Sequence, residues 1–254
     1  MNILVANDDG IQARGIKELV KALSQVANVY VCAPESQRSA SGHGITVSKP
    51  IIIEEDEFEY AEYALKISGT PADCVKIGMR SLEQKGIKVD MVFSGINHGG
   101  NLGTDTLYSG TVSAAIEGSL LGVPSVAVSV NSHEAEYFDY ACELAVEAVK
   151  KAYDKMSSKT VLNINTPNLP KEEIKGLRFT TLGPREYKEV FVPVETEDGR
   201  TGYMYTGDPV VYNDLPETVD VVADQDGYAS ITPIHSDLTD YKLAKEISEW
   251  RIGK

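Results

Sequence analysis

The sequence lacks the short motifs that mark several large enzyme classes. No GxGxxG follows the first apolar segment and no GxxxxGK[ST] occurs, so neither a dinucleotide fingerprint nor a P-loop is indicated. No GxSxG is present, which argues against a serine hydrolase of the α/β type. The four histidines do not form HExxH, and the three cysteines lack metal-ligand spacing. None of these motif-defined classes is therefore indicated.

Long apolar runs are also missing. No stretch approaches the roughly 18 to 20 apolar residues of a membrane span, so no membrane partner is expected. The N-terminus leads directly into a strand, without the basic and apolar regions of a secretory signal. The cysteines are odd in number and far apart, which is typical of reduced thiols. These features predict a cytoplasmic protein.

Positive charge is scarce, with 24 basic against 38 acidic residues and a net charge of −14. Such an acidic chain is not expected to bind a nucleic-acid polymer, whose phosphates are neutralised by Lys and Arg. A small phosphorylated substrate remains compatible, provided that a bound metal supplies a local positive centre. The length of 254 residues and a hydrophobic content of 42% are sufficient for a substantial core.

Short apolar runs alternate with helical spacing over about the first two-thirds of the chain. This alternation predicts a Rossmann-like, doubly wound, mostly parallel α/β sheet. The expected strands are residues 3–6, 28–33, 89–93, 123–130 and 161–164, with extended segments at 45–53 and 60–67. The expected helices are residues 16–26, 71–82, 112–121 and 134–153. Thr70 is the expected N-cap of the second helix.

The amino-acid composition changes beyond Thr166. Residues 177–232 are rich in Thr, Val and Tyr and contain three turn signals, at Asp198-Gly199, Gly207-Asp208 and Asp226-Gly227. We expect hairpins that project from the α/β body, followed by a short helix around residues 241–250. Because projecting arms often form subunit contacts, we also expect an oligomer.

Two adjacent carboxylates, Asp8 and Asp9, directly follow the first apolar run. The carboxyl ends of parallel strands form the ligand-binding edge of an open α/β sheet, so the pair is expected there. A turn with a helix N-cap explains one acidic residue and Gly10, but not two side-by-side charges that repel each other. A divalent cation relieves that repulsion, so we predict a metal site at this pair.

Two polar loops follow predicted parallel strands and are expected at the same edge. They are ESQRSASGHG at residues 35–44 and SGINHGGNLGTDTLYSGT at residues 94–111. Hydroxyl and N–H groups in a glycine-rich loop before a helix can hold phosphate oxygens, although a plain loop capped by Ser109 is the simpler reading. The oxygen-only donor set suits Mg²⁺ or Mn²⁺ rather than zinc. For His43 and His98 an exposed or structural role is favoured over a catalytic one.

Five segments resemble the SurE (survival protein E) nucleotidase family. In chain order they are NILVANDDG, APESQRSASGHGIT, SGTPADCV, SGINHGGNLGTDTLYSGTVSAAIEG and YASITPIH. The resemblance implies one domain over residues 1–254, with an α/β nucleotidase core at 1–166. It also implies a hairpin-rich C-terminal extension at 167–254 that is exchanged between the subunits of a homodimer or homotetramer.

The resemblance further implies a cytoplasmic 5′-nucleotidase that hydrolyses nucleoside monophosphates, with 3′-nucleotides as further candidate substrates, and that needs one divalent metal ion, Mg²⁺ or Mn²⁺. By position, the family's metal ligands fall on Asp8, Asp9, Ser39 and Asn97. Its phosphate-side residues fall on Asn101, Ser109, Gly110 and Thr111. Asp8 and Asp9 are the expected catalytic residues, and the sequence leaves open whether one of them acts as a general base or as a nucleophile.

One residue departs from the family pattern, because Gly100 stands where several members carry proline. Glycine there predicts a more mobile loop without changing its ligands. His98 occupies a position that the family fills with different residue types, which supports a non-essential role.

Two alternatives remain from the residues themselves. A nucleotide-binding regulatory module without turnover is compatible with the fold, because Rossmann-like sheets host many functions. However, binding alone rarely needs adjacent carboxylates next to an anionic ligand. A metal-dependent glycosyltransferase would need a sizeable sugar pocket, and no aromatic-rich loop is present to build one.

Overall fold

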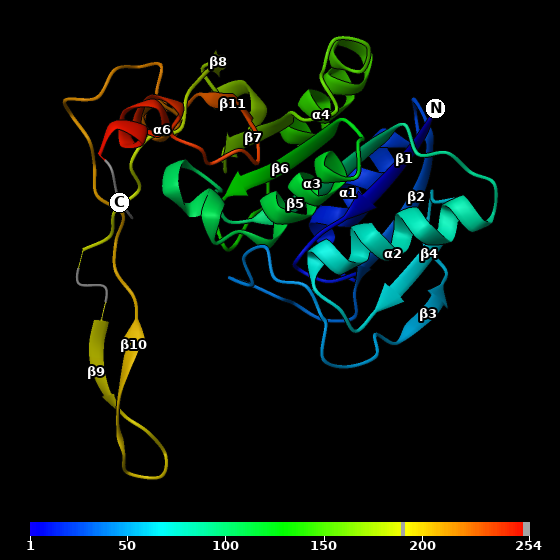
Figure 1. The fold of residues 1–254 in the computed structure, drawn as a ribbon, viewed down its shortest axis with the longest axis horizontal. Coiled ribbons are helices and arrows are strands. Elements are labelled where there is room, and N and C mark those ends of the chain that lie inside the picture. The colour runs from blue at the N-terminus through cyan, green and yellow to red at the C-terminus, as the bar shows by residue number, and fades with distance from the viewer. Residues whose placement is uncertain (189–190, 251–254) are drawn as a thin grey trace.

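The computed structural model describes residues 1–188 and 191–250. Its centre is a nine-stranded sheet in the order β3-β4-β2-β1-β5-β6-β7-β11-β8 (Figure 1). A separate two-stranded hairpin is formed by β9 and β10. The central strands β4, β2, β1, β5, β6 and β7 are mutually parallel, which confirms the predicted mostly parallel α/β fold.

The strand and helix bounds agree with the sequence periodicity over most of the chain. The strands of the large sheet are β1 Asn2–Ala6, β2 Asn28–Pro34, β3 Ile53–Asp56, β4 Tyr63–Ile67, β5 Met91–His98, β6 Ser125–Asn131, β7 Val161–Pro167, β8 Leu177–Phe179 and β11 Ala229–Ile234. The hairpin strands are β9 Phe191–Glu195 and β10 Thr201–Tyr205. The α-helices are α1 Arg14–Leu23, α2 Pro71–Gln84, α3 Gly110–Leu120, α4 Asp139–Ala152, α5 Asp220–Gln225 and α6 Tyr241–Glu246.

Helices cover both faces of the sheet and bury its apolar strands. Helices α1 and α4 pack on one face in a core that includes Ile16, Leu19 and Phe93. Helices α2 and α3 lie side by side on the opposite face, where Cys74 and Leu82 pack against Leu4. Because both faces are covered, ligands can reach the central strands only at their ends. The carboxyl ends carry Asp8, Asp9 and both predicted polar loops.

Two local predictions from the sequence have clear outcomes. Thr70 caps α2 as predicted: its hydroxyl accepts a hydrogen bond from the Asp73 N–H, and the Asp73 carboxylate accepts one from the Thr70 N–H. Residues 45–52, predicted as extended, are not part of a strand, and pairing with β4 begins only at Ile53. Residues 45–50 are mostly exposed, so the apolar side chains there have no sheet face to cover.

The region beyond residue 167 contributes to the main sheet as well as projecting from it. Strand β11 pairs antiparallel with β7, and β8 pairs parallel with β11. Within the described residues only β9 and β10 form a hairpin in this region, with its turn at the predicted Asp198-Gly199. The Asp226-Gly227 signal instead ends helix α5, an element that the sequence analysis did not anticipate.

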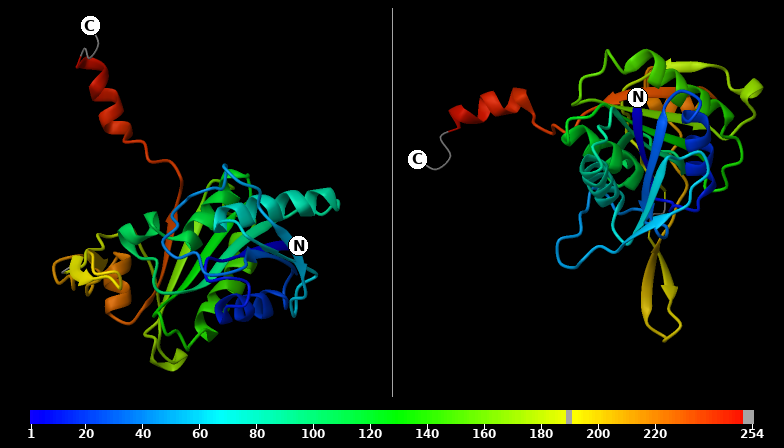
Figure 2. Two further views of the ribbon diagram at one scale, coloured as in Figure 1. Left: turned by 90° about the horizontal axis from the view of Figure 1, so that it is seen from below. Right: turned by 90° about the vertical axis from the view of Figure 1, so that its right-hand side faces the viewer.

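Two segments leave the compact body in different directions. The β9–β10 hairpin, in yellow, and helix α6, in red, both extend away from the sheet (Figures 1 and 2). Both carry exposed apolar or aromatic side chains, among them Phe191, Tyr203, Tyr241 and Leu243. Within the described part of the chain, none of the helices has the length and apolar character needed to cross a membrane.

Candidate metal and phosphate site

The turn after β1 is fixed by short-range hydrogen bonds. The Asn7 side-chain amide donates to the Gly10 carbonyl at 2.8 Å, and the Ile11 N–H donates to the Pro34 carbonyl at 2.8 Å. Gly10 has a φ of +98°, a conformation that side chains rarely adopt. A Cβ at this position would also lie 3.2 Å from the Ser36 carbonyl carbon. These constraints present Asp8 and Asp9 together at the end of the strand.

Asp8 is a buried carboxylate, only 5% exposed. The Thr111 hydroxyl donates a hydrogen bond to its Oδ1, and the Arg38 N–H donates to its backbone carbonyl at 2.7 Å. Burial raises the pKa of Asp8 to about 6; the Thr111 hydrogen bond opposes this shift and the Asp9 charge adds to it. The protein thus holds a carboxylate where its negative charge is poorly solvated.

Asp9 connects the turn to both polar loops. Its Oδ2 accepts a hydrogen bond from the His98 N–H at 3.1 Å, and its Oδ1 accepts one from the Gln37 amide at 3.4 Å. Burial raises the pKa of Asp9, and the hydrogen bond from the His98 backbone opposes that rise. The Asp9 carboxylate is therefore hydrogen-bonded to His98, which follows Asn97, and to Gln37, which lies two residues before Ser39.

The side chain of Asn97 is oriented by its own loop. Its amide nitrogen donates to the Gly99 carbonyl at 2.7 Å, which leaves the side-chain oxygen as the free acceptor. Ser39 lies in the exposed loop after β2, one residue beyond Arg38. All four sequence-predicted metal ligands thus lie at one edge of the sheet, with Asn97 near the end of β5 and the other three in segments that follow β1 and β2.

These residues fit a divalent metal ion that binds oxygen. Within the described residues, neither Asp8 nor Asp9 forms an ion pair with a lysine or arginine. A buried carboxylate without a cationic partner is costly, and a cation offsets that cost. In the same part of the chain no cluster of three or more His, Cys, Asp or Glu forms a metal site. The carboxylates therefore need neutral oxygens, such as those of Ser39 and Asn97, to complete a coordination shell.

Helix α3 begins directly beside Asp8. The Ser109 hydroxyl caps the helix by accepting a hydrogen bond from the Val112 N–H at 3.0 Å. A Cβ at Gly110 would lie 2.8 Å from both Cβ and Oδ2 of Asp8, so only glycine allows this approach. The helix start places the positive end of its dipole, and the first-turn N–H groups of Gly110 and Thr111, next to the carboxylate pair. A phosphate bound there would be held by backbone donors.

The Thr111 hydroxyl is expected to orient Asp8. Replacing Thr111 with valine keeps the shape of the buried side chain but removes the hydroxyl that bonds Asp8. We expect about a tenfold weaker affinity for Mn²⁺, measured by calorimetry, because a hydrogen bond to a charged group is lost. Serine at the same position retains the hydroxyl and should restore most of the affinity. Equal affinities for the parent and the valine variant would contradict this role.

Asn101 is held by side chains from three strand positions. Its backbone N–H donates to Asn165 Oδ1 at 2.8 Å, and its carbonyl accepts hydrogen bonds from Asn163 and Asn165 at 2.8 and 3.2 Å. Its own amide donates to the Ser129 hydroxyl at 2.8 Å. Polar side chains from within β6 and β7 therefore hold this residue in a buried position.

The sequence analysis did not single out Asn163, Asn165 or Asn131. The available signal was the alternation in the segment VLNINTP, where two asparagines stand on an otherwise apolar strand. Both are buried, and a buried amide needs partners. That pattern indicates a neighbouring polar loop.

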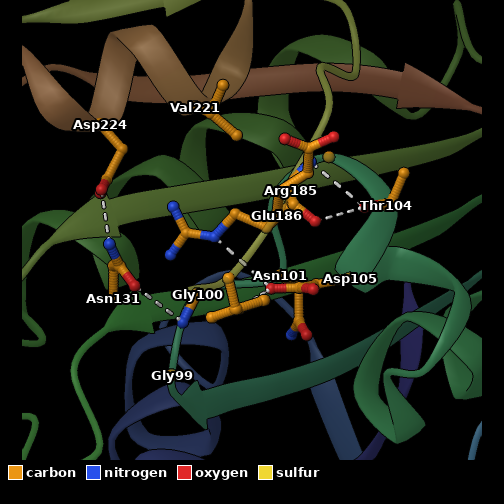
Figure 3. A network of polar contacts seen from close by, with 12 residues as sticks. Gly99, Gly100, Asn101, Thr104, Asp105, Asn131, Arg185, Glu186, Val221 and Asp224 are labelled. Atoms are coloured by element: carbon orange, nitrogen blue, oxygen red, sulfur yellow. Dashed lines mark hydrogen bonds and ion pairs between the residues drawn. The ribbon is translucent and has the colours of Figure 1, made fainter. Parts of the chain in front are cut away.

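Gly100 is more tightly held than the sequence analysis expected. Its N–H donates to Asn131 Oδ1 at 3.2 Å, so an external hydrogen bond restrains the loop (Figure 3). A Cβ at this position would lie 2.6 Å from the same oxygen. The loop therefore has a specific contact where greater mobility was predicted.

Two histidines near the site contact protein groups. His43 Nε2 lies 2.9 Å from the buried carboxylate of Glu117, which also pairs with Lys76 at 2.7 Å. This contact fastens the loop that contains Ser39 to helix α3. The ring centroid of His98 lies 5.4 Å from that of Phe138, and the His98 backbone N–H donates a hydrogen bond to Asp9. Both arrangements agree with the favoured structural roles.

Comparison with known proteins gives a consistent family assignment. The model of the family described as Survival protein SurE matches residues 3–189. A "5′-nucleotidase SurE" from Syntrophomonas wolfei is 46% identical over 97% of this chain and 93% of its own length. Another, from Alkaliphilus metalliredigens, is 42% identical and covers 100% of both chains.

A solved structure supports the same assignment. The SurE protein from Aquifex aeolicus superposes with a TM-score of 0.84 at 39% identity, over 98% of this chain and 99% of that one. On the matching family model, the full-length relatives and the shared structure, the chain belongs to the SurE family.

Proposed function

We propose that this protein is a divalent-metal-dependent phosphomonoesterase that hydrolyses nucleoside 5′-monophosphates to nucleoside and inorganic phosphate, with 3′-monophosphates as further candidate substrates. The observation that carries the proposal is the buried carboxylate of Asp8 beside the start of α3, which has no lysine or arginine ion-pair partner among the described residues. Asp8 and Asp9 can bind a cation, and the start of α3 beside them can bind an anion. Together they suit the phosphate group of an ester. Relatives described as 5′-nucleotidases supply the nucleotide as the substrate class.

In the proposed site, Asp8, Asp9, Ser39 and Asn97 hold one Mg²⁺ or Mn²⁺ ion. When bound, the ion supplies Lewis-acid chemistry, which neutralises phosphate charge and favours deprotonation of water. The two carboxylates orient the attacking water. The family relationship supports this assignment.

The glycine-rich loop and α3 hold the phosphate in the proposed site. Asn101, Ser109, Gly110 and Thr111 form the phosphate side, with the backbone donors at the helix start aimed at the equatorial oxygens. Fixed donors stabilise charge that develops during in-line displacement without having to reorganise. The Thr111 hydroxyl is occupied by Asp8, so this residue contributes to phosphate binding through its backbone.

The direct test is phosphate release from a panel of nucleoside 5′- and 3′-monophosphates. Each nucleotide is assayed with Mg²⁺, with Mn²⁺ and with EDTA. The proposal expects release that depends on metal and that EDTA abolishes. No release with either metal from folded protein would contradict it and would favour a nucleotide-binding module without turnover.

We also propose a cytoplasmic homodimer or homotetramer assembled through the projecting C-terminal segments. The exposed apolar side chains of the β9–β10 hairpin and of α6 support this proposal, because such surfaces are typical of subunit contacts. The free thiols Cys32, Cys74 and Cys142 suit a reducing compartment. Light scattering on the full chain should give the mass of two or four subunits, and a monomer would contradict the proposal.

A further inference from the structure

The backbone of the glycine-rich loop is held from outside by an asparagine–aspartate pair. The Gly100 N–H donates to Asn131 Oδ1 at 3.2 Å, and Asn131 Nδ2 donates to Asp224 Oδ2 at 2.5 Å. Asn131 is the last residue of β6, whereas Asp224 lies on the short helix α5. Figure 3 shows the three residues in line, from the helix to the loop.

The chemistry of the pair fixes the direction of both hydrogen bonds. An ionised carboxylate only accepts hydrogen bonds, so the Asn131 NH₂ group must face Asp224. The Asn131 oxygen is then directed at the Gly100 N–H, which only donates. Asp224 thus determines which end of the amide meets the loop, although it does not touch the loop itself.

Helix α5 also hydrogen-bonds the loop on the other side of Asn101, at Gly103. Asp220 Oδ2 accepts a hydrogen bond from the Gly103 N–H at 2.8 Å, and its Oδ1 accepts one from the Gly183 N–H at 2.9 Å. Helix α5 therefore restrains the backbone on both sides of Asn101, directly at Gly103 and through Asn131 at Gly100.

The charge on Asp224 is buried at a cost. Burial raises its pKa to about 6, the hydrogen bond from Asn131 is the main opposing effect, and the Arg185 charge adds to that opposition. Its Oδ1 is buried and has no hydrogen-bond partner within the described residues. Arg185 is itself paired with Asp105, 3.6 Å away, on the loop side (Figure 3). A partly satisfied buried carboxylate is unfavourable for stability, which suggests that it serves another purpose.

We propose that Asn131 and Asp224 are positioning residues for the phosphate-side loop. Through Gly100 they set the position of Asn101, so a helix outside the α/β core controls phosphate binding. The effect on catalysis rests on the proposed nucleotidase function, whereas the effect on the loop does not.

An exchange of the two partners tests the proposal. Asn131→Asp removes the donor and places a second carboxylate against Asp224, which pushes residue 131 away from the Gly100 N–H. The double variant N131D/D224N reverses the pair: the new amide at 224 donates to the new carboxylate at 131, which again accepts from Gly100. Assays at about pH 8 keep Asp224 ionised in the parent.

Hydrogen exchange of the peptide that contains residues 99–103 is the first measurement. We expect about tenfold faster exchange in N131D and a return towards the parent rate in N131D/D224N, since one hydrogen bond to the loop is lost and then restored. Exchange is measured without substrate or metal, so failure of the nucleotidase proposal would leave this result intact.

The second measurement separates substrate binding from metal binding. For N131D we expect kcat/KM to fall about tenfold, mainly through KM for the nucleotide, with recovery in the double variant. The Mn²⁺ affinity measured by calorimetry should fall by less than kcat/KM, because Asn131 reaches the proposed ligand Asn97 only indirectly, through the Gly99–Gly100 peptide group. A general structural defect would lower both quantities to the same extent and would not be repaired by the exchange.

Asp226→Asn is the matched control. Like D224N it replaces an aspartate by asparagine, but at the residue directly after α5, where Asp226 pairs with Arg178 of β8 at 2.7 Å. Loop exchange and KM should remain at parent values in this control. Parent-like exchange and kinetics in N131D, or no recovery in the double variant, would overturn the proposal. So would an equal defect in D226N.

Discussion

Asp8→Asn is expected to lower metal-dependent phosphate release by about a thousandfold or more while the protein remains folded. The variant keeps the size of the side chain, and the Thr111 hydroxyl can still donate to the remaining oxygen. What it loses is a full negative charge at the proposed cation, whose Lewis-acid effect contributes several kcal/mol to catalysis. Phosphate release and Mn²⁺ affinity should fall together.

This substitution should not lower the stability of the metal-free protein. Burial raises the pKa of Asp8 to about 6, so its charge opposes folding at neutral pH when no metal is bound. We therefore expect the melting temperature of metal-free D8N to equal or exceed that of the parent. Asp90→Asn is the control: Asp90 accepts a hydrogen bond from the Asn2 N–H at 2.8 Å, at the opposite edge of the sheet. Near-full turnover in D8N would refute the metal-site assignment.

Gly15→Ala is expected to destabilise the protein and weaken its metal site, although alanine is the better helix former. A Cβ at Gly15 on α1 would lie 1.9 Å from the Ile96 carbonyl oxygen and 2.9 Å from its carbon. Both are backbone atoms and cannot rotate away. The gain of about 1 kcal/mol in helix propensity is therefore outweighed by an overpacking cost of roughly 2 to 3 kcal/mol.

The same clash reaches the site, because Ile96 immediately precedes Asn97. Either α1 or the end of β5 must move, and movement of β5 displaces the proposed ligand. Urea unfolding should show a lower unfolding free energy, and calorimetry should show weaker Mn²⁺ binding. Lys17→Ala, an exposed substitution on the same helix, should change stability by no more than about 0.5 kcal/mol. A Gly15→Ala protein that matches the parent in both measurements would contradict this close-packing argument.

The α/β core could be predicted because its strands and helices are encoded locally. The run Ile3–Ala6 is apolar and short, and Ile16, Leu19 and Leu23 recur at helical spacing, so each segment identifies its own structure. The carboxylate pair was informative for a related reason. Two adjacent charges at a strand end have no adequate local explanation, so they indicate a ligand.

Other elements depend on contacts that the sequence does not display. Residues 45–52 have strand-like composition, but no neighbouring strand is available to pair with them before Ile53. Helix α5 is only six residues long, too short for a periodic signal, and its importance comes from Asp220 and Asp224 meeting a loop more than 110 residues away. The asparagine cradle around Asn101 likewise depends on long-range pairing.

The central claim is that Asp8 and Asp9 bind a divalent metal at the carboxyl edge of the sheet. The most direct test is a crystal structure of the protein grown with Mn²⁺, with the metal located by its anomalous scattering. The account predicts one strong peak, roughly 2 Å from oxygens of Asp8 and Asp9, with Ser39 and Asn97 completing the protein ligands. An ion bound elsewhere, or no ion in crystals of a protein that releases phosphate in the same Mn²⁺ solution, would contradict it.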